Sequence, residues 1–175
     1  MPQEGVKFNI DVVSLSGEPV APKDHATKFT RICGVVVRDQ IPINTQEWHH
    51  PKEGRPISFV DERAKNRLWD TLIPHFTLLE YLTECDVEKV KQAALRKMSI
   101  QFQTWKKNVW QSYVQAEKKT PEFGGALVKV KDHWDLFVRH KESDEVKQQS
   151  IINKANEEKK GLPCYGSRWL QVRAT

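Results

Sequence analysis

One long helical pattern constrains the fold of this chain more than any other feature. After Asp86, a natural N-cap residue, apolar side chains recur at spacings of three, four and one, which places them on one face of an α-helix. Thr120-Pro121 and Gly124-Gly125 end the pattern. The helix should run for about 30 residues, on the order of 45 Å, and its apolar face needs other helices to cover it. That face consists of Val90, Ala94, Met98, Phe102, Trp105, Val109, Trp110 and Tyr113.

The same segment carries more positive charge than the whole chain. Residues 89–119 hold eight basic residues and one acid, Glu117, which gives +7, whereas the chain has a formal net charge of +5. The other residues therefore sum to −2. Because one segment is so unevenly charged, we expect its partner to be a polyanion. The basic residues are Lys89, Lys91, Arg96, Lys97, Lys106, Lys107, Lys118 and Lys119.

The N-terminal part favours β-structure and turns. Phe8, Ile10 and Val12 alternate with polar residues, which is the pattern of a half-buried strand. A second strand is predicted from Arg31 to Arg38, because its three consecutive valines carry β-branched side chains. Pro42 follows this strand, removes a backbone donor and confines its segment to a sheet edge or a turn.

Shorter helical patterns precede and follow the long one. From Asp61 onward, apolar residues return at helical spacing as far as Phe76, and Pro74 predicts a kink or a break within them. A third helix is indicated around Trp134. A fourth begins near Ser143, with acids in its first turn, and ends in a strongly polar stretch.

These patterns predict an α+β chain that is mainly α. We expect a β- and turn-rich portion over residues 1–56, followed by a helical domain over 57–160 and a short tail over 161–175. The helical domain should be a bundle of three or four helices that includes the one long basic amphipathic helix.

Cysteine usage and hydropathy predict a cytosolic or nuclear protein. Cys33, Cys85 and Cys164 are far apart and form no paired motif, so neither a disulfide framework nor a structural zinc site is expected. No apolar run approaches the roughly 18 residues that span a bilayer, and the N-terminus shows no secretory signal.

Several short motifs follow one another along the chain. They are Gly34-Val35-Val36-Val37-Arg38, Ile41-Pro42-Ile43 with Trp48, Leu68-Trp69 with Phe76, Phe102 with Trp105-Lys106, Trp134 with Phe137-Val138, the polar stretch Ser143 to Lys160, and Gly166-Ser167-Arg168. In this order and spacing, from about Phe29 to Trp169, they resemble the conserved block of the plant transposase family called Ptta/En/Spm. Leu162-Pro163-Cys164-Tyr165 replaces the family's histidine-containing lead into its last motif, so no site that depends on this histidine is expected.

The resemblance implies a role with DNA rather than a reaction. Sequences of this family are encoded by CACTA-type plant transposons and their domesticated relatives. The implied role is association with transposon DNA in the nucleus, through an accessory part that differs from a nuclease core.

The residues themselves predict no enzyme, no cofactor and no metal site. A strand-transfer core needs three carboxylates that converge on two metal ions, and the acids here lack the helix–strand alternation of such a core. Asp61, Asp86 and Asp144 are better explained as helix-start residues. His49-His50 and His133 lack a metal-binding motif, and no nucleophile or phosphate-loop motif is present.

Two segments provide candidate DNA contacts. The long helix provides a basic side that can neutralise phosphates, and the polar helix after Ser143 adds amides that can contact base edges. The alternative is a protein–protein interaction or oligomerisation module, in which the aromatic stripe packs on a partner or a second copy. The candidate DNA-binding residues are Arg96, Lys97, Lys106, Lys107, Lys147, Asn153, Lys154 and Lys159.

Overall fold

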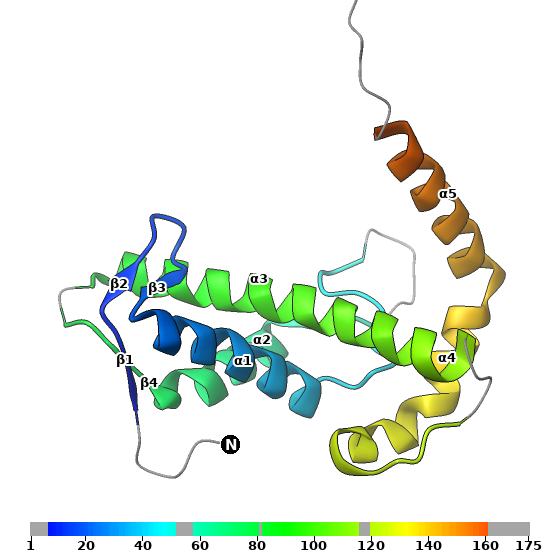
Figure 1. Cartoon of the computed structure of the whole chain (residues 1–175), viewed down its shortest axis with the longest axis horizontal. Coiled ribbons are helices and arrows are strands. Elements are labelled where there is room, and N and C mark those ends of the chain that lie inside the picture. Colours follow the sequence, from blue (N-terminus) through cyan, green and yellow to red (C-terminus); the bar gives the residue numbers. More distant parts are fainter. Residues whose placement is uncertain (1–6, 52–57, 81, 116–119, 161–175) are drawn as a thin grey trace, which may run out of the picture. The chain divides into compact units, whose positions relative to one another are not determined.

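The computed structural model describes residues 7–51, 58–80, 82–115 and 120–160, with the side chains of 126 and 157–160 left aside. It is mainly helical with small N-terminal strands, which confirms the predicted fold class. Contacts divide the chain into two compact units, Met1–Val138 and Arg139–Thr175. The elements (Figure 1) are β1 (Phe8–Ile10), β2 (Val12–Val13), β3 (Pro19–Ala21), α1 (Lys23–Gln40), α2 (Glu62–Leu72), η1 (Ile73–His75), β4 (Phe76–Leu78), α3 (Glu84–Val109), η2 (Trp110–Gln115), η3 (Gly125–His133), α4 (Trp134–Glu142) and α5 (Asp144–Lys160).

The long helix predicted from the sequence is present. α3 continues without a break into η2, a π-helical segment, and the two together cover 32 residues. Its first residue differs from the prediction, because Thr83 and not Asp86 is the N-cap. The Thr83 hydroxyl accepts a hydrogen bond from the backbone N–H of Asp86, and the Asp86 carboxylate accepts one from the backbone N–H of Thr83. This capping box satisfies two backbone donors that would otherwise lack partners.

The apolar face of α3 lies in the core, as its spacing predicted. Val90, Met98 and Phe102 are buried within a cluster that joins α1, α2, α3 and the small strands. A second cluster lies near the C-terminal end of α3 and is built on Ile43, Val109, Val130, Trp134 and Phe137. The partly buried Trp105 packs against both clusters and so links them.

The strand predicted from Arg31 to Arg38 is wrong, because these residues belong to α1. The prediction relied on the β-propensity of three valines, which is a weak preference that packing overrides. Phe29, Cys33 and Val37 recur every four residues and are all buried, whereas Val35 remains 39% exposed. In a strand, Val35 would share the face of Cys33 and Val37, and Val36 would point away from them. Val36 is instead buried and Val35 exposed, which fits a helix.

The strands form two small sheets that join distant parts of the chain. β1 pairs in parallel with β4, and Phe8 lies opposite Phe76 in the register. The Phe76 ring also meets the Phe29 ring of α1 edge to face, with ring centroids 5.0 Å apart. β2 and β3 form an antiparallel hairpin. The N-terminal strands are thereby fixed to the helical core at α1 and at the end of α2.

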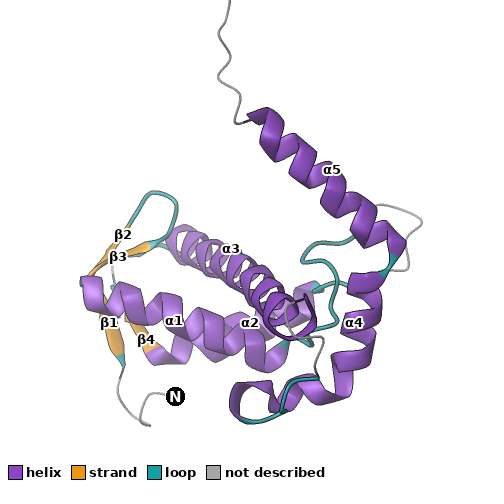
Figure 2. Cartoon of the chain, turned by 45° about the vertical axis from the view of Figure 1, so that its right-hand side comes forward, coloured by secondary structure: helices purple, strands orange, loops and turns teal. Residues whose placement is uncertain are grey.

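α2 begins and ends as the sequence predicted. The Asp61 carboxylate caps it by accepting a hydrogen bond of 2.7 Å from the backbone N–H of Ala64. The helix ends at Leu72, and Pro74 lies in the short η1 turn that leads into β4. Pro74 cannot continue the backbone hydrogen-bonding pattern of a helix, so the chain breaks there. α1 runs alongside α3 in two views, and α2 lies behind α1 in Figure 1 (Figures 1 and 2).

The second unit is described by itself and contains the end of α4 and the whole of α5. Nearly every described side chain of α5 is exposed, including Ile151 and Ile152. A helix that is polar on all sides has no face that must be buried. The predicted tail over 161–175 lies outside the described residues. None of the described helices has the length and apolar character needed to cross a membrane.

Replacement of Gly17 by alanine should strongly destabilise the protein. Gly17 has φ +85°, and an added Cβ would lie 2.3 Å from the carbonyl atoms of Lys89 in α3. The backbone strain and the clash should together cost at least about 2 kcal/mol of unfolding free energy in urea denaturation. Gly125→Ala is the matched control, since Gly125 has φ +54° with open space around it, and it should show the strain alone. Equal losses in the two variants would contradict the close contact of the hairpin with α3.

Stability should fall at high pH because of Cys33. Burial raises the pKa of the Cys33 thiol from 9.0 to about 12, against the opposing effect of the Lys97 ammonium. Between these values the unfolded chain loses the thiol proton and the folded chain keeps it, so stability decreases as pH rises. The slope from this group should reach about 1.4 kcal/mol per pH unit.

Urea denaturation between pH 8 and 11 measures this slope. Cys33→Ala should flatten it, whereas Cys85→Ala, at an exposed thiol, should leave it unchanged. A slope that is the same in all three proteins would contradict the assignment.

Candidate nucleic-acid interface

The candidate interface is organised by the contact between α1 and α3. Gly34 of α1 faces Gln101 of α3, and a Cβ at Gly34 would lie only 1.9 Å from the side-chain oxygen of Gln101. The Gln101 amide donates a hydrogen bond of 2.8 Å to the backbone carbonyl of Thr30. The absence of a side chain at Gly34 therefore leaves room for the Gln101 side chain, which joins the two helices by a polar contact.

Basic side chains surround this contact on both helices. Arg31 and Arg38 precede and follow Gly34 by three and four residues, which places all three on one side of α1. The Arg38 guanidinium donates from Nε to the carbonyl of Gly34 at 2.7 Å. Lys97, one turn before Gln101, is half-buried, and its charge acts on the nearby Cys33 thiol. The contact thus brings cations from the two helices together.

The exposed side of α3 continues the positive surface. Arg96 and Lys107 are both exposed and are eleven residues apart, which is about three helical turns on the same side. We call the set Arg31, Arg38, Arg96, Lys97 and Lys107 the basic face.

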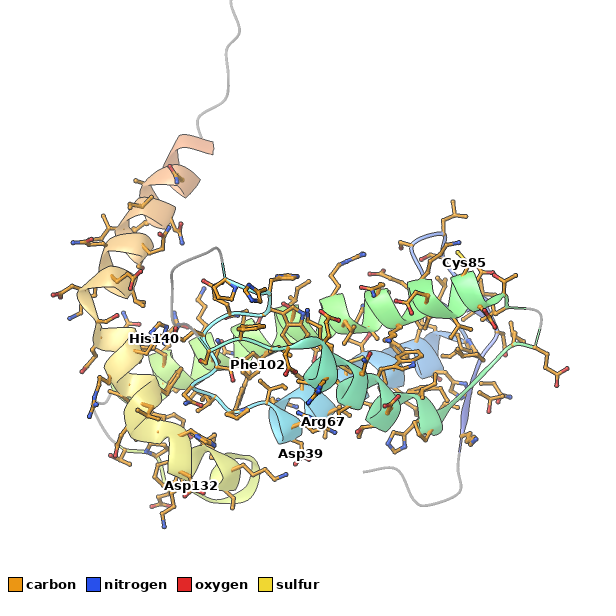
Figure 3. All side chains as sticks on the ribbon, turned by 180° about the vertical axis from the view of Figure 1, so that it is seen from behind. Asp39, Arg67, Cys85, Phe102, Asp132 and His140 are labelled. Carbon is orange, nitrogen blue, oxygen red and sulfur yellow. The ribbon has the colours of Figure 1, made fainter. Side chains whose placement is uncertain are left out.

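No acidic residue lies within the two stretches of sequence that carry the basic face. No Asp or Glu occurs from residue 25 to 38 or from residue 89 to 115. α2 is different, because it mixes acids and bases and contains an ion pair between Glu62 and Lys65 at 2.7 Å. α2 lies behind α1 in Figure 1 and in front in Figure 3, where Arg67 is labelled. Positive charge therefore predominates in these two stretches, although Asp39 directly follows Arg38, whereas α2 mixes charges of both signs.

Lys106 does not belong to this surface, and its prediction as a DNA contact is wrong. Only 4% of the residue is exposed. Its ammonium donates to the backbone carbonyl of Thr45 at 2.7 Å and lies 4.7 Å from the centre of the Phe102 ring. A buried ammonium needs such partners to offset its lost hydration. It cannot also reach a phosphate on the outside.

Lys106 has a structural task instead. The segment after α1 carries the buried side chains of Ile41, Ile43 and Trp48 across the core. A buried carbonyl in such an irregular segment requires a donor. Lys106 supplies that donor to Thr45, and so α3 holds this segment in place.

Two other lysines of α3 have partners within the chain. The Lys89 ammonium lies 3.0 Å from the Asp86 carboxylate, and Lys91 donates to the side-chain carbonyl of Asn66 in α2 at 2.9 Å. Lys118 and Lys119 lie outside the described residues. Of the eight basic residues counted in the sequence, three remain on the basic face.

The polar helix α5 presents its candidate residues to solvent. Lys147, Asn153 and Lys154 are exposed, and the Asn153 side-chain carbonyl accepts a hydrogen bond of 3.0 Å from Gln149. The side chain of Lys159 is outside the described set. These residues belong to the second unit, and they form a separate group from the basic face.

The sequence-based search missed Arg31 and Arg38, because it assigned them to a strand. The spacing of apolar residues from Phe29 onward fits a helix, but the three valines favoured the assignment of a strand. Among the described residues, no three His, Cys, Asp or Glu side chains are grouped closely enough to hold a metal ion. The His50 ring instead packs at a tilt against the Phe59 ring, with ring centroids 4.7 Å apart.

The basic face consists of cations that are held on rigid helices, and such a surface suits the binding of anions. Guanidinium and ammonium groups form charge-assisted hydrogen bonds with phosphate oxygens. Comparisons with protein-family models, curated proteins and solved structures find no match for this chain. The candidate interface therefore rests on the residues described above.

Substitution of the adjacent residues Lys106 and Lys107 should have different effects on stability. Lys106→Met leaves the carbonyl of Thr45 without this donor, and we expect a loss of about 1–3 kcal/mol in unfolding free energy. Lys107→Met, at an exposed position, should change stability by less than about 0.5 kcal/mol. Thermal and urea denaturation measure both. A fully stable Lys106→Met protein would refute the structural task of this lysine.

Proposed function

We propose that this chain is a non-catalytic DNA-binding module whose basic face contacts the phosphate backbone. The observation that carries the proposal is a set of five cations on two adjacent helices, in stretches of sequence without an acid. The proposed setting, a transposon-derived protein that acts in the nucleus of a plant, rests on the resemblance to the Ptta/En/Spm family alone.

The physical basis of the binding is counterion release. Each Lys or Arg that neutralises a phosphate releases condensed cations from DNA, and the slope of log K against log salt changes by about 0.9 per contact. Arginine guanidinium groups also present several donors to phosphate oxygens. Contacts of this kind position a protein on DNA and do not by themselves select a sequence.

α5 is a second proposed contact region. Its exposed Lys147 and Lys154 suit phosphates, and Asn153 has an amide that can bond to a base edge. Because α5 belongs to a separate unit, its contribution should add to that of the basic face rather than depend on it.

The alternative function is protein–protein interaction or oligomerisation, and it requires residues other than the aromatic stripe of α3. Within the aromatic stripe of α3, Phe102 is only 1% exposed, and Trp105, Trp110 and Tyr113 are partly buried against the chain's own apolar clusters. The observation that now favours this alternative is the exposure of Ile151 and Ile152 on α5, at 69% and 52%. Two adjacent exposed isoleucines offer apolar area to a partner or a second copy.

Removal of two cations from the basic face should weaken DNA binding and reduce its salt dependence. We expect Arg96→Gln/Lys107→Gln to lower the affinity for a duplex about tenfold at low salt and to reduce the salt slope by about 1.8. Fluorescence anisotropy with a labelled duplex, between about 50 and 200 mM salt, measures both quantities.

Arg63→Gln/Arg67→Gln is the matched control, because it removes the same charge from exposed positions on α2. It should leave the slope nearly unchanged. Equal effects of the two variants would indicate attraction by net charge without a defined face. No binding by the unmodified protein at low salt would overturn the proposal, and a concentration-dependent oligomer lost in Ile151→Ser/Ile152→Ser would favour the alternative.

A further inference from the structure

A pocket of about 290 Å³ opens at the C-terminal end of α1. It lies between the last residues of α1, the segment that follows them, α3 and η3. Small-molecule sites span about 300–1,000 Å³, so this pocket suits a small ligand rather than a large cofactor. Its charged and aromatic lining residues are Arg38, Asp39, Trp105, Lys129, Asp132 and His133.

The pocket and the basic face share a residue. Arg38 lines the pocket, and its guanidinium also bonds to the carbonyl of Gly34 at the α1–α3 contact. Asp39 and Asp132 are labelled in Figure 3, at the end of α1 and in the segment before α4. Arg38 therefore belongs both to the basic face and to the lining of this pocket.

The charges of the lining are balanced. Arg38 and Lys129 oppose Asp39 and Asp132, and the Lys129 ammonium is hydrogen-bonded to both the carboxylate and the backbone carbonyl of Asp39. A bare phosphate favours an excess of positive charge, and this lining has none. A neutral ligand with donors and acceptors along one edge suits paired carboxylates and cations better.

The lining also contains two flat rings. Trp105 and His133 are both half-exposed and come from α3 and η3. Indole and imidazole rings stack on the faces of nucleobases, which carry hydrogen-bonding groups on their edges. Carboxylates accept hydrogen bonds from base amino groups, and Arg or Lys donates to base carbonyl and ring nitrogen acceptors.

We propose that this pocket binds one nucleobase, either of a free nucleotide or of an unpaired residue in the nucleic acid that the basic face holds. In this proposal Trp105 and His133 stack on the base, and the Asp132 carboxylate accepts a hydrogen bond from the base edge. Arg38 faces the phosphate of the same nucleotide. The polynucleotide source of the base rests on the proposed function, whereas binding of a free nucleotide does not.

Titration with 5′-mononucleotides of the four bases tests the pocket directly. The readout is the indole N–H signal of Trp105 in a ¹H–¹⁵N spectrum, assigned by its loss in Trp105→Phe. We expect at least one nucleotide to shift this signal, and ribose 5-phosphate, which lacks a base, to leave it in place. Asp132→Asn and His133→Ala, at a surface carboxylate and a half-exposed ring, should each abolish the shift while the protein remains folded.

A second experiment identifies the source of the base. A duplex with one unpaired nucleotide should bind about tenfold more tightly than the same duplex with an abasic residue at that position. Asp132→Asn should remove this preference and leave the salt slope unchanged, whereas Arg96→Gln/Lys107→Gln should reduce the slope and keep the preference.

The outcomes separate the two proposals. Duplex binding with no preference for the unpaired base, together with no shift by any mononucleotide, overturns the pocket and leaves the proposed function standing. A mononucleotide shift without duplex binding supports the pocket with a free nucleotide as its ligand and overturns the proposed function.

Discussion

The close contact of α1 with α3 at Gly34 is the constraint on which the candidate interface depends. A larger residue at this position would meet the side chain of Gln101, which donates to Thr30 in the same contact. Arg38 lies within this contact, and the Lys97 charge acts on Cys33 of α1, so cations of both helices flank it. The same contact fixes the end of α1, where the pocket opens. The two helices are therefore joined both by apolar packing in the core and by a polar link between facing residues.

The position of Lys106 shows why charge in a sequence does not equal charge on a surface. Lys106 and Lys107 are identical and adjacent, yet one bonds to the carbonyl of Thr45 in the core and the other is exposed. A helix turns by about 100° per residue, so neighbours along the chain face different surroundings. The number of basic residues correctly indicated that α3 is positive, but it could not show which of these cations are exposed to solvent.

Local patterns predicted the elements with strong signals, and packing decided the others. The stripe from Val90 to Tyr113 keeps a helical period over about six turns, and Pro74 forbids a continuous helix, so both predictions are confirmed. The three valines before Arg38 have the opposite local preference from the fold they adopt. Their assignment depends on contacts with α3, where Gln101 bonds to Thr30 of α1 across 71 residues of sequence. The buried place of Lys106 depends in the same way on a segment 61 residues away.

The basic face combines cations from two helices, and this affects how it can recognise an anion. α3 alone contributes three cations to the face, and α1 adds two whose position requires the folded core. Cations held on two packed helices are fixed relative to one another, so little side-chain and backbone freedom is lost when they meet an anion. A peptide with the sequence of α3 would carry Lys106 on its surface and lack Arg31 and Arg38. Such a peptide would still be positively charged, but its cations would be arranged differently from those of the basic face. The fold, and not the composition alone, therefore determines which anions this surface can match.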